Sequence, residues 1–311
     1  MLLRLKVELF FSGKDFLMKR SLVVTAMLIS ACVAGSASAQ TLQKVADANK
    51  ITVSYREASV PFSYLIGSKT AIGFSVELVD AIVEDVRKKT RKPNLEVSYM
   101  AVTSQNRIPL MVNGTIDLEC GSTTNNSTRA KDVTFSTNIF YTGTRLLTKK
   151  DSGIKNYADL AGKTVASTTG TTNAQVIRKY SADKKLDMQI VLGKDHDDSL
   201  LLVENDRAKA FAMDDILLFG LRANSKNPAA LEVVGDSIQV EPYACFMRKD
   251  DLEFKKLVDG TLSRLMKSGE FNRLYTKWFM SPIPPKGVNL NLPMSAELKD
   301  NLKTMSDKPA M

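Results

Sequence analysis

The sequence predicts an α/β fold with two lobes or domains. Its 311 residues are too many for one small hydrophobic core. From about residue 50 onward, short β-rich runs alternate with helix-like stretches, the order of elements typical of α/β folds with mostly parallel sheets. The hydrophobic content of 44% and the charged content of 25% are ordinary for a soluble globular protein.

The first half of this pattern begins with a predicted strand at residues 50–55. Residues 73–88 follow as an amphipathic helix, because Val79, Ile82 and Val86 recur at helical spacing on one face. Beyond this helix we expect, in order, a strand at 95–100, a short helix at 104–111, a strand at 115–120 and a polar loop at 121–129.

The second half repeats the alternation. A strand at 164–167 leads into a loop at 168–172, which opens a helix at 173–180. We then expect strands at 188–192, 208–213 and 241–248, and helices at 197–204, 254–268 and 271–278. The prolines around Ile283 end the predicted core, and the tail beyond about Lys286 is expected to be polar and peripheral.

Residues 1–39 are predicted to be a signal peptide with an over-extended start. A basic group at 18–20 precedes an apolar stretch at 21–33 that is too short to span a bilayer. The small residues that precede Gln40 predict signal-peptide cleavage before Gln40. Met18 is a better candidate for the start of translation than Met1, so residues 1–17 would not be part of the natural chain. Since no other apolar stretch is long enough to cross a membrane, we expect an exported, soluble protein in the periplasm.

The three cysteines bear on this prediction. Cys32 follows a short lipoprotein-like motif, so lipid anchoring at Cys32 is the alternative to cleavage before Gln40. The other two, Cys120 and Cys245, would meet an oxidising compartment after export. Each lies in a strand-like run, so they can pair only where those strands are neighbours, and two buried free thiols are the alternative.

The net charge of +9 does not point to nucleic acid. Residues 1–39 contribute +3 of it, and the remaining +6 is scattered among acidic residues without a long basic run. A mildly basic protein with a small anionic ligand explains this charge as well as a nucleic-acid partner does. We therefore expect no nucleic-acid partner.

Several kinds of catalytic or metal site are excluded. The sequence has one histidine, His196, so a zinc site with several histidines is impossible. It contains no G-x-S-x-G elbow, no P-loop and no C-x-x-C motif. These features argue against common hydrolases and nucleotide enzymes, although not against every enzyme, and we expect no catalytic residue, metal or cofactor.

Hydroxyl and cationic side chains lie at the ends of the predicted elements. Ser122, Thr124 and Arg129 follow the strand that ends at Cys120, and Thr172 lies at the start of a helix, where the dipole favours anions. A planar guanidinium with hydroxyls beside it suits a carboxylate. Singly, Ser122 and Thr124 can equally be helix caps.

A second group offers another charged pocket. Arg56 and Arg107, with Ser104 beside them, could hold a second carboxylate, and Asp214 at the end of an apolar strand could hold an ammonium group. Together these groups suit a zwitterion with an extra carboxylate. The alternatives are that the two arginines are surface charges, that Asp214 is a turn residue and that His196 belongs to a solvated loop.

Several segments resemble a known family. Residues 73–82 (GFSVELVDAI) are similar to the helix signature of family 3 extracellular solute-binding proteins. Residues 55–64 (YREASVPFSY), 103–110 (TSQNRIPL) and 119–126 (ECGSTTNN) resemble, more narrowly, the members that bind glutamate and aspartate for ABC importers. Three shorter motifs do so too, Lys194-Asp195-His196, Met213-Asp214-Asp215 and Lys277-Trp278-Phe279. The resemblance runs in order from about residue 41 to about residue 290.

This resemblance implies a two-lobed periplasmic-binding-protein fold of type II, in which two crossing hinge strands join the lobes and the ligand lies in the cleft. Lobe one would comprise 40–141 and 244–311, and lobe two 142–243. The crossings would fall near 140–144 and 240–244. Both Cys120 and Cys245 would then belong to lobe one, which favours their disulfide.

The resemblance also implies a role for each candidate. Arg129, Thr124 and Thr172 would bind the α-carboxylate of the ligand. Asp214 and the region of Ser122 would hold its α-ammonium group. The side-chain carboxylate would contact a third group, Arg56, Ser104, Arg107 and His196.

The implied function is capture of glutamate or aspartate by lobe closure and delivery to the membrane permease of an ABC importer, by a monomer. One alternative is an enzyme of dehydratase type on the same scaffold, with Glu57, Asp214 or His196 as the acid or base. Another is a sensory amino-acid-binding module. The sequence contains no receptor or signalling segment that would favour the sensor.

Overall fold

The computed structural model of the protein describes residues 41–67 and 70–310. The predicted signal peptide at 1–39, the cleavage point before Gln40 and the alternative lipid site at Cys32 lie outside the described residues. Within 41–67 and 70–310, no helix has both the length and the apolar character needed to span a membrane.

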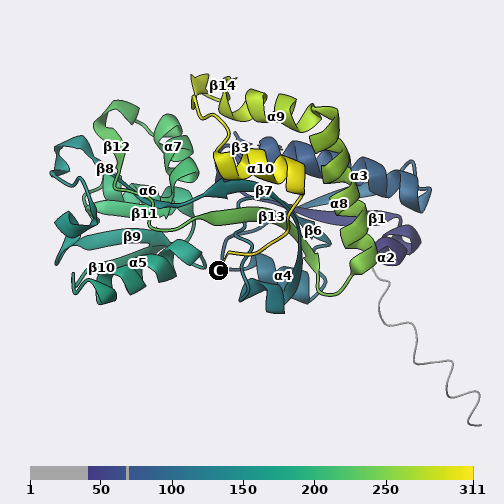
Figure 1. Ribbon diagram of the computed structural model, residues 1–311, viewed down its shortest axis with the longest axis horizontal. Coiled ribbons are helices and arrows are strands. Elements are labelled where there is room, and N and C mark those ends of the chain that lie inside the picture. The colour runs from purple at the N-terminus through teal and green to yellow at the C-terminus, as the bar shows by residue number, and fades with distance from the viewer. Residues whose placement is uncertain (1–40, 68–69, 311) are drawn as a thin grey trace, which may run out of the picture. The chain divides into compact units, whose positions relative to one another are not determined.

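The first sheet collects strands from both ends of the described chain. Its order is β5-β1-β6-β13-β7 (Figure 1). Strand β1 runs parallel to its neighbours β5 and β6, whereas β13 runs antiparallel to both of its neighbours. The bounds are β1 Lys50–Tyr55, β5 Glu96–Ala101, β6 Leu118–Glu119, β7 Val133–Thr142 and β13 Glu241–Arg248.

The second sheet is built from the middle of the chain, in the order β10-β9-β11-β8-β12. Here β9 runs parallel to β10 and β11, and β8 runs antiparallel to β11 and β12. The bounds are β8 Thr144–Lys149, β9 Thr164–Thr168, β10 Gln189–Gly193, β11 Ala210–Asp214 and β12 Leu231–Val234.

Helices pack against both sheets (Figure 1). With the first sheet lie α2 Thr41–Ala48, α3 Phe74–Thr90, α4 Arg107–Val112, α8 Leu252–Ser268, α9 Glu270–Phe279 and α10 Ala296–Thr304. With the second lie α5 Thr172–Asp183, α6 His196–Glu204 and α7 Asp215–Asn224. The smaller strands are β2 Ala58–Ser59, β3 Ser63–Ile66, β4 Thr70–Ile72, β14 Pro282–Ile283 and β15 Val288–Asn289, and short 3₁₀ turns occupy η1 Arg129–Lys131, η2 Lys150–Ser152, η3 Tyr157–Leu160 and η4 Pro228–Ala230.

The chain passes twice between the two sheets. On the first passage β7 ends at Thr142 in the first sheet, and β8 begins at Thr144 in the second. On the return, β12 ends at Val234 and β13 begins at Glu241. The strand that begins after each passage, β8 in the second sheet and β13 in the first, runs antiparallel to its neighbours. Both sheets are therefore mixed and not mostly parallel, which corrects that part of the sequence prediction. The α/β class is confirmed.

The predicted disulfide is present. Cys120 directly follows β6, Cys245 lies within β13, and these two strands are neighbours. Their sulfur atoms are bonded, closing a sequence separation of 125 residues. The alternative of two free thiols is therefore wrong, because the strand pairing of β6 with β13 brings the two side chains together.

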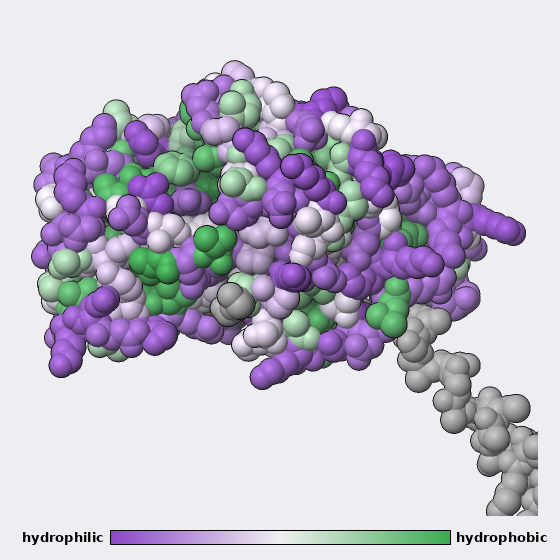
Figure 2. Space-filling view, viewed as in Figure 1, coloured by the Kyte–Doolittle hydropathy of each residue, from purple (hydrophilic) through white to green (hydrophobic). Residues whose placement is uncertain are grey.

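Large buried aromatic side chains join the elements around the first sheet. Phe62, Phe74 and Phe279 are fully buried, and Phe140 of β7 stacks on Phe279 with ring centroids 5.1 Å apart. Such packing removes much apolar surface from water and favours offset or edge contacts between rings. On the face seen in Figure 2, hydrophilic residues predominate and hydrophobic ones form separate patches.

The C-terminal tail differs from its prediction as a peripheral segment. Helix α10 packs on β7, and its Leu298 and Asn301 are buried. Only one large apolar residue of this helix is fully covered, so hydrophobic periodicity is weak there and did not reveal the helix.

Candidate functional site

The candidate residues come together at one pocket. Eight of the nine predicted site residues line it, and Arg56 contacts two of those eight. The lining residues are Ser104, Arg107, Ser122, Thr124, Arg129, Thr171, Thr172, Asn173, His196, Met213, Asp214 and Leu217. They follow the carboxyl ends of strands in both sheets, where open α/β sheets place their ligands.

Two of the arginines are buried rather than solvated. Arg56 and Arg107 are each only 2% exposed, so the alternative of surface charges is wrong. Arg56 Nη2 donates to Ser104 Oγ at 2.9 Å, and Arg107 Nη1 donates to the backbone oxygen of Ser122 at 3.3 Å. Among residues 41–67 and 70–310, neither Arg56 Nη1 nor Arg107 Nε has a hydrogen-bond partner. Unpaired N–H groups on buried cations fit an anion that binds here.

His196 is also buried, which corrects the alternative of a solvated loop. It is 1% exposed at the first turn of α6, where the side chain of Asp195 caps the helix. Its Nε2 lies 3.4 Å from Arg56 Nη2, and its Nδ1 lies 3.0 Å from Thr168 Oγ1. Since the guanidinium can only donate, Nε2 accepts and Nδ1 carries the proton in a neutral ring.

Burial lowers the pKa values of Arg56, Arg107 and His196. Burial, followed by the charge of Arg107, lowers the pKa of Arg56 to about 9. Burial also lowers the pKa of Arg107. The pKa of His196 is held well below its usual range by burial and then by Arg56 and Arg107. An anion bound between these groups would favour their charged forms. This part of the pocket is therefore suited to binding an anion.

A third arginine, Arg129, lines the same pocket. Arg129 donates from Nη1 to the backbone oxygen of Thr124 at 3.0 Å and from Nη2 to that of Gly170 at 3.2 Å. Burial, followed by Arg107, lowers its pKa to about 10. Because Gly170 belongs to the loop after β9 and Thr124 follows β6, Arg129 links the two sheets at the pocket.

Glu241 holds two of the predicted hydroxyl groups. The hydroxyls of Thr124 and Thr172 both donate to Glu241 Oε2, the latter at 2.7 Å, and they lie 3.4 Å apart. Glu241 is 1% exposed at the start of β13, on the return passage between the sheets. Sequence reasoning missed it because it assigned this segment to a hinge crossing and not to the pocket.

Asp214 supplies an acidic group within the same pocket. It is 3% exposed at the end of β11 and accepts hydrogen bonds from Tyr243 and, at 2.8 Å, from Asn173 Nδ2. Burial, followed by the charge of Glu241, raises the pKa of Asp214 to about 7. A bound cation would favour the ionised form of Asp214. The alternative that Asp214 is only a turn residue does not account for its burial.

Ser122 and Asn173 complete the polar lining. Ser122 Oγ donates to Ser59 Oγ at 3.1 Å. Asn173, which sequence reasoning missed, is 1% exposed, and its Oδ1 has no partner within the described part of the chain. The signal that could have found it is its place one residue after Thr172, in the first turn of a helix at a strand end.

Two glycines allow the halves of the molecule to approach closely. A Cβ at Gly170 would lie 2.6 Å from Gln105 Cα, and a Cβ at Gly220 would lie 2.4 Å from the Val60 backbone oxygen. Gly170 and Gly220 belong to the loop and helix beside the second sheet, whereas Gln105 and Val60 belong with the first. The pocket is therefore bordered by backbone contacts between the two sheet layers.

The arrangement suits binding of a small molecule with two negative groups and one positive group. Arg129 and the start of α5 could donate to one anion, Arg56 and Arg107 could donate to a second, and Asp214 could accept from a cation. Within residues 41–67 and 70–310, no cluster of three or more histidine, cysteine or acidic side chains is placed to hold a metal ion.

Comparisons with known proteins place this geometry in context. Residues 51–281 match the model of bacterial extracellular solute-binding proteins, family 3. The chain is 48% identical to the L-glutamate/L-aspartate-binding protein of Pseudomonas aeruginosa, across 93% of this chain and 96% of that protein. It is 47% identical to the glutamate/aspartate import solute-binding protein of Escherichia coli, across 93% and 95%.

A solved structure shows a similar fold. A mutant of ArgBP from T. maritima superposes with a TM-score of 0.68 at 26% identity, across 77% of this chain and 99% of that one. The chain is thus similar in sequence to two proteins named as glutamate/aspartate-binding proteins and similar in fold to the solved structure of ArgBP.

Proposed function

Because this chain belongs to family 3 of the bacterial extracellular solute-binding proteins, we propose that it captures glutamate and aspartate for an ABC importer. The chain is a binding protein rather than an enzyme, as are its relatives that are 47–48% identical. It has the two-lobed periplasmic-binding-protein fold of type II. The names of those relatives support an acidic amino acid as the ligand.

The observation that carries the proposal is the buried pair Arg56 and Arg107. Each is 2% exposed, and each keeps an N–H group without a partner among the described residues. Burying two cations in one pocket is costly unless an anion joins them. The side-chain carboxylate of the ligand would meet this need, aided by Ser104 and the neutral ring of His196.

Asp214 would bind the α-ammonium group. Its carboxylate is buried and already fixed by Tyr243 and Asn173, so a ligand ammonium would meet an oriented acceptor. The Oδ1 of Asn173, which has no partner among the described residues, adds a second acceptor on this side. Ser122 would contribute to the same region through its hydroxyl.

The α-carboxylate would bind to Arg129 and the start of α5. Helix α5 begins at Thr172, and its first turn presents backbone N–H groups where the dipole favours an anion. Thr124 and Thr172 would lie beside the carboxylate, but each hydroxyl has one hydrogen and now donates it to Glu241. Binding would therefore require these two hydroxyls to be shared with Glu241 or turned away from it.

Lobe closure would follow from the distribution of these groups. We propose that residues 40–141 and 244–311 form lobe one, that 142–243 form lobe two, and that the protein acts as a monomer in the periplasm. Arg56 and Arg107 lie on the first, and Asp214 and Thr172 on the second. A ligand that contacts both lobes favours the closed form, which a membrane permease would then recognise.

A thermal-stability screen tests the ligand class. The purified protein is unfolded and refolded to remove carried-over ligand, and its melting temperature is measured with each of a panel of amino acids. A ligand that binds only the folded state raises the melting temperature. We expect the largest increases with glutamate and aspartate, whereas an equal or larger increase with glutamine, asparagine or arginine would contradict the proposed ligand.

A further inference from the structure

The last thirty residues of the chain follow the part that matches the family model, which ends at residue 281. They are held in place from α10 onward. In α10, Leu298 is buried, Asn301 is 2% exposed, and Ser295 caps the first turn. After this helix the chain continues without regular secondary structure to Ala310. We call residues 306–310 the terminal strap.

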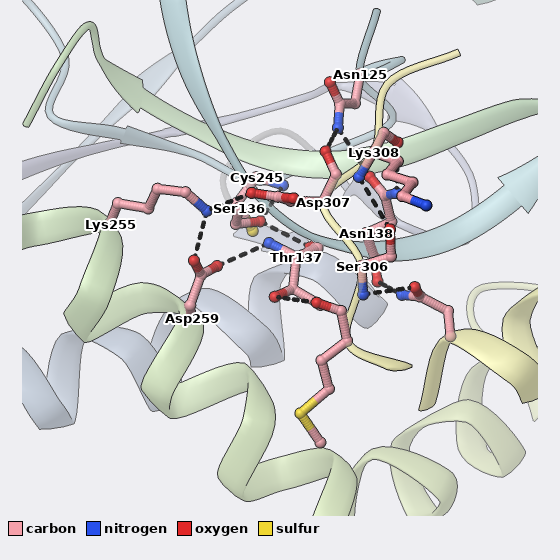
Figure 3. A network of polar contacts seen from close by, with 12 residues as sticks. Asn125, Ser136, Thr137, Asn138, Cys245, Lys255, Asp259, Ser306, Asp307 and Lys308 are labelled. Carbon is pink, nitrogen blue, oxygen red and sulfur yellow. Dashed lines mark hydrogen bonds and ion pairs between the residues drawn. The ribbon is translucent and has the colours of Figure 1, made fainter. Parts of the chain in front are cut away.

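The strap is bonded along β7 through one buried asparagine, Asn138 (Figure 3). The Asn138 backbone N donates to the Ser306 oxygen at 2.9 Å, and its Nδ2 donates to the Lys308 oxygen at 2.9 Å. The backbone oxygen of Asn138 accepts from Asn301 Nδ2 at 2.6 Å. Asn138 thus bonds to the tail where β7 and β13 pair irregularly, next to Ala244.

The strap also holds the loop that carries two proposed ligand contacts. Asn125 is 1% exposed, and its Nδ2 donates to the Asp307 oxygen at 2.8 Å and to Asn138 Oδ1 at 3.0 Å. The backbone oxygen of Asn125 accepts from the Ala310 N–H at 2.8 Å. On the other side, the Asn125 N–H donates to the Pro242 oxygen at 2.8 Å. Asn125 is therefore fixed between the return strand and the strap.

The residues next to Asn125 bear on the pocket. Thr124 precedes it and lines the pocket, and Asn126 follows it and pairs with Ala310 in a parallel bridge. The side chain of Asn126 accepts from the Arg129 N–H at 2.9 Å, which fixes the start of the turn that carries the Arg129 guanidinium. Residues 124–129 thus depend on contacts with the strap on one side and with β13 on the other.

An ion pair anchors the strap from outside the loop. Lys255 Nζ lies 3.0 Å from Asp307 Oδ2 and 2.6 Å from Asp259 Oδ2. Asp259 Oδ1 in turn accepts from the Thr137 N–H of β7 at 2.7 Å. Figure 3 shows this chain of contacts from α8 across β7 to the strap.

We infer that the terminal strap is a positioning element for the pocket: through Asn125 it holds Thr124 and Arg129 in the geometry that binds the ligand. The inference rests on the proposed function. Without the strap, the buried Asn125 amide loses one acceptor and its carbonyl loses its donor, so residues 124–129 gain freedom that binding must remove again. A loop ordered before binding gives higher affinity than one ordered by the ligand.

The test compares the purified protein with a chain ending at Met305, with Asn125→Ala and with the two changes combined. The control Asn272→Ala changes an exposed asparagine of α9. Dissociation constants for glutamate are measured by calorimetry well below each melting temperature, with folding checked by circular dichroism. We expect each single change to weaken binding by about tenfold, or about 1.4 kcal/mol, and the control to match the original protein.

The combined variant separates positioning from general destabilisation. If both changes act through the Asn125–strap contacts, their effects on affinity are far less than additive. Unchanged affinity in the shortened chain, or fully additive losses, would overturn the inference. If the shortened chain does not fold, Asn125→Ala decides, and an affinity equal to that of the control overturns it. Original protein that binds no amino acid would refute the proposed function, and this inference with it.

Discussion

Arg56 and Arg107 lie in a pocket where neither can be solvated, and burial lowers the pKa of both. Such an arrangement costs stability in the free protein and is offset only when an anion binds. Under the proposed function, the preference for a second carboxylate would depend on these two side chains. These two arginines would increase the affinity for an anionic ligand and decrease the stability of the ligand-free protein. Affinity and stability should therefore respond in opposite directions when either arginine is replaced.

Replacing Arg56 with methionine tests this separation. Arg56→Met is expected to weaken glutamate binding by about thirtyfold or more, the cost of removing one partner of a buried charge pair. The ligand-free protein is expected to keep or gain stability, because a buried cation is removed. Calorimetry and thermal unfolding measure the two effects, with Arg178→Met, an exposed change on α5, as control. A large loss of ligand-free stability would instead make Arg56 a structural residue.

Asp214 predicts a pH dependence of binding. Burial, followed by Glu241, raises its pKa to about 7 from a model value of 3.8. In the free protein Asp214 therefore keeps its proton below about pH 7. This bound proton adds folding stability at low pH, and that stability is lost as the pH rises from 3.8 to about 7. An ammonium group requires the ionised form. Affinity should thus rise with pH up to about 7 and then level, with proton release on binding below that point.

The groups that face Asp214 do not obscure this dependence. Tyr243 stays protonated because burial and Asp214 raise its pKa well above its usual value, and the pKa of His196 is held well below its usual range. Calorimetry in buffers of different ionisation enthalpy counts the released protons. Asp214→Asn should bind weakly with a flat profile. A flat profile in the unaltered protein would contradict the assignment of the ammonium group to Asp214.

Sequence reasoning found the charged residues of the pocket but not their environment. The residue types Arg56, Arg107 and Asp214 are visible in the sequence, whereas their burial depends on how the strands are arranged. Glu241 was missed because its segment, near 240–244, was assigned to a hinge crossing. Asn173 was missed because an asparagine in a first helical turn is commonly a local cap.

Among the elements, helix α7 bears on lobe closure through Gly220. This glycine has ordinary helical geometry, yet a Cβ there would lie 2.4 Å from the Val60 backbone oxygen of the other sheet layer. Gly220→Ala should therefore favour the helix by about 1 kcal/mol while obstructing the close approach of the two lobes. We expect weaker glutamate binding without loss of ligand-free stability.

Gly260→Ala is the matched control for this helix substitution. Gly260 lies in α8, and a Cβ there would meet nothing within 4 Å. Both variants are examined by calorimetry and thermal unfolding. Equal affinities for the two variants would contradict a role for the Gly220–Val60 contact in the ligand-bound form.

The elements themselves were predictable where hydrophobic periodicity is strong. Helix α3 and strand β1 follow the predicted ranges closely, because their apolar residues alternate or recur without interruption. The strand predicted at 115–120 is shorter, since the N–H groups of Thr115 and Ile116 donate to Leu110 at the end of α4 instead of to a strand. Tertiary contacts of this kind leave no signal in a single sequence.

At the scale of the whole molecule, two passages between the sheets connect the halves that form the pocket. The first consists of Gly143 alone between β7 and β8, and the second runs from Val234 to Glu241. Under the proposed assignment, Arg56, Arg107 and Arg129 lie on one half, and Asp214 lies on the other. A ligand that fits both sets of groups therefore favours their approach, and one that fits a single set does not.

Small-angle scattering with glutamate, and separately with the same concentration of glutamine, tests this account most directly. Glutamine differs by the loss of the second carboxylate, so it would leave Arg56 and Arg107 without their anion. We expect glutamate to reduce the radius of gyration of the refolded, ligand-free protein and glutamine at that concentration to leave it unchanged. An unchanged radius with glutamate, or an equal reduction with glutamine, would contradict closure driven by the second carboxylate.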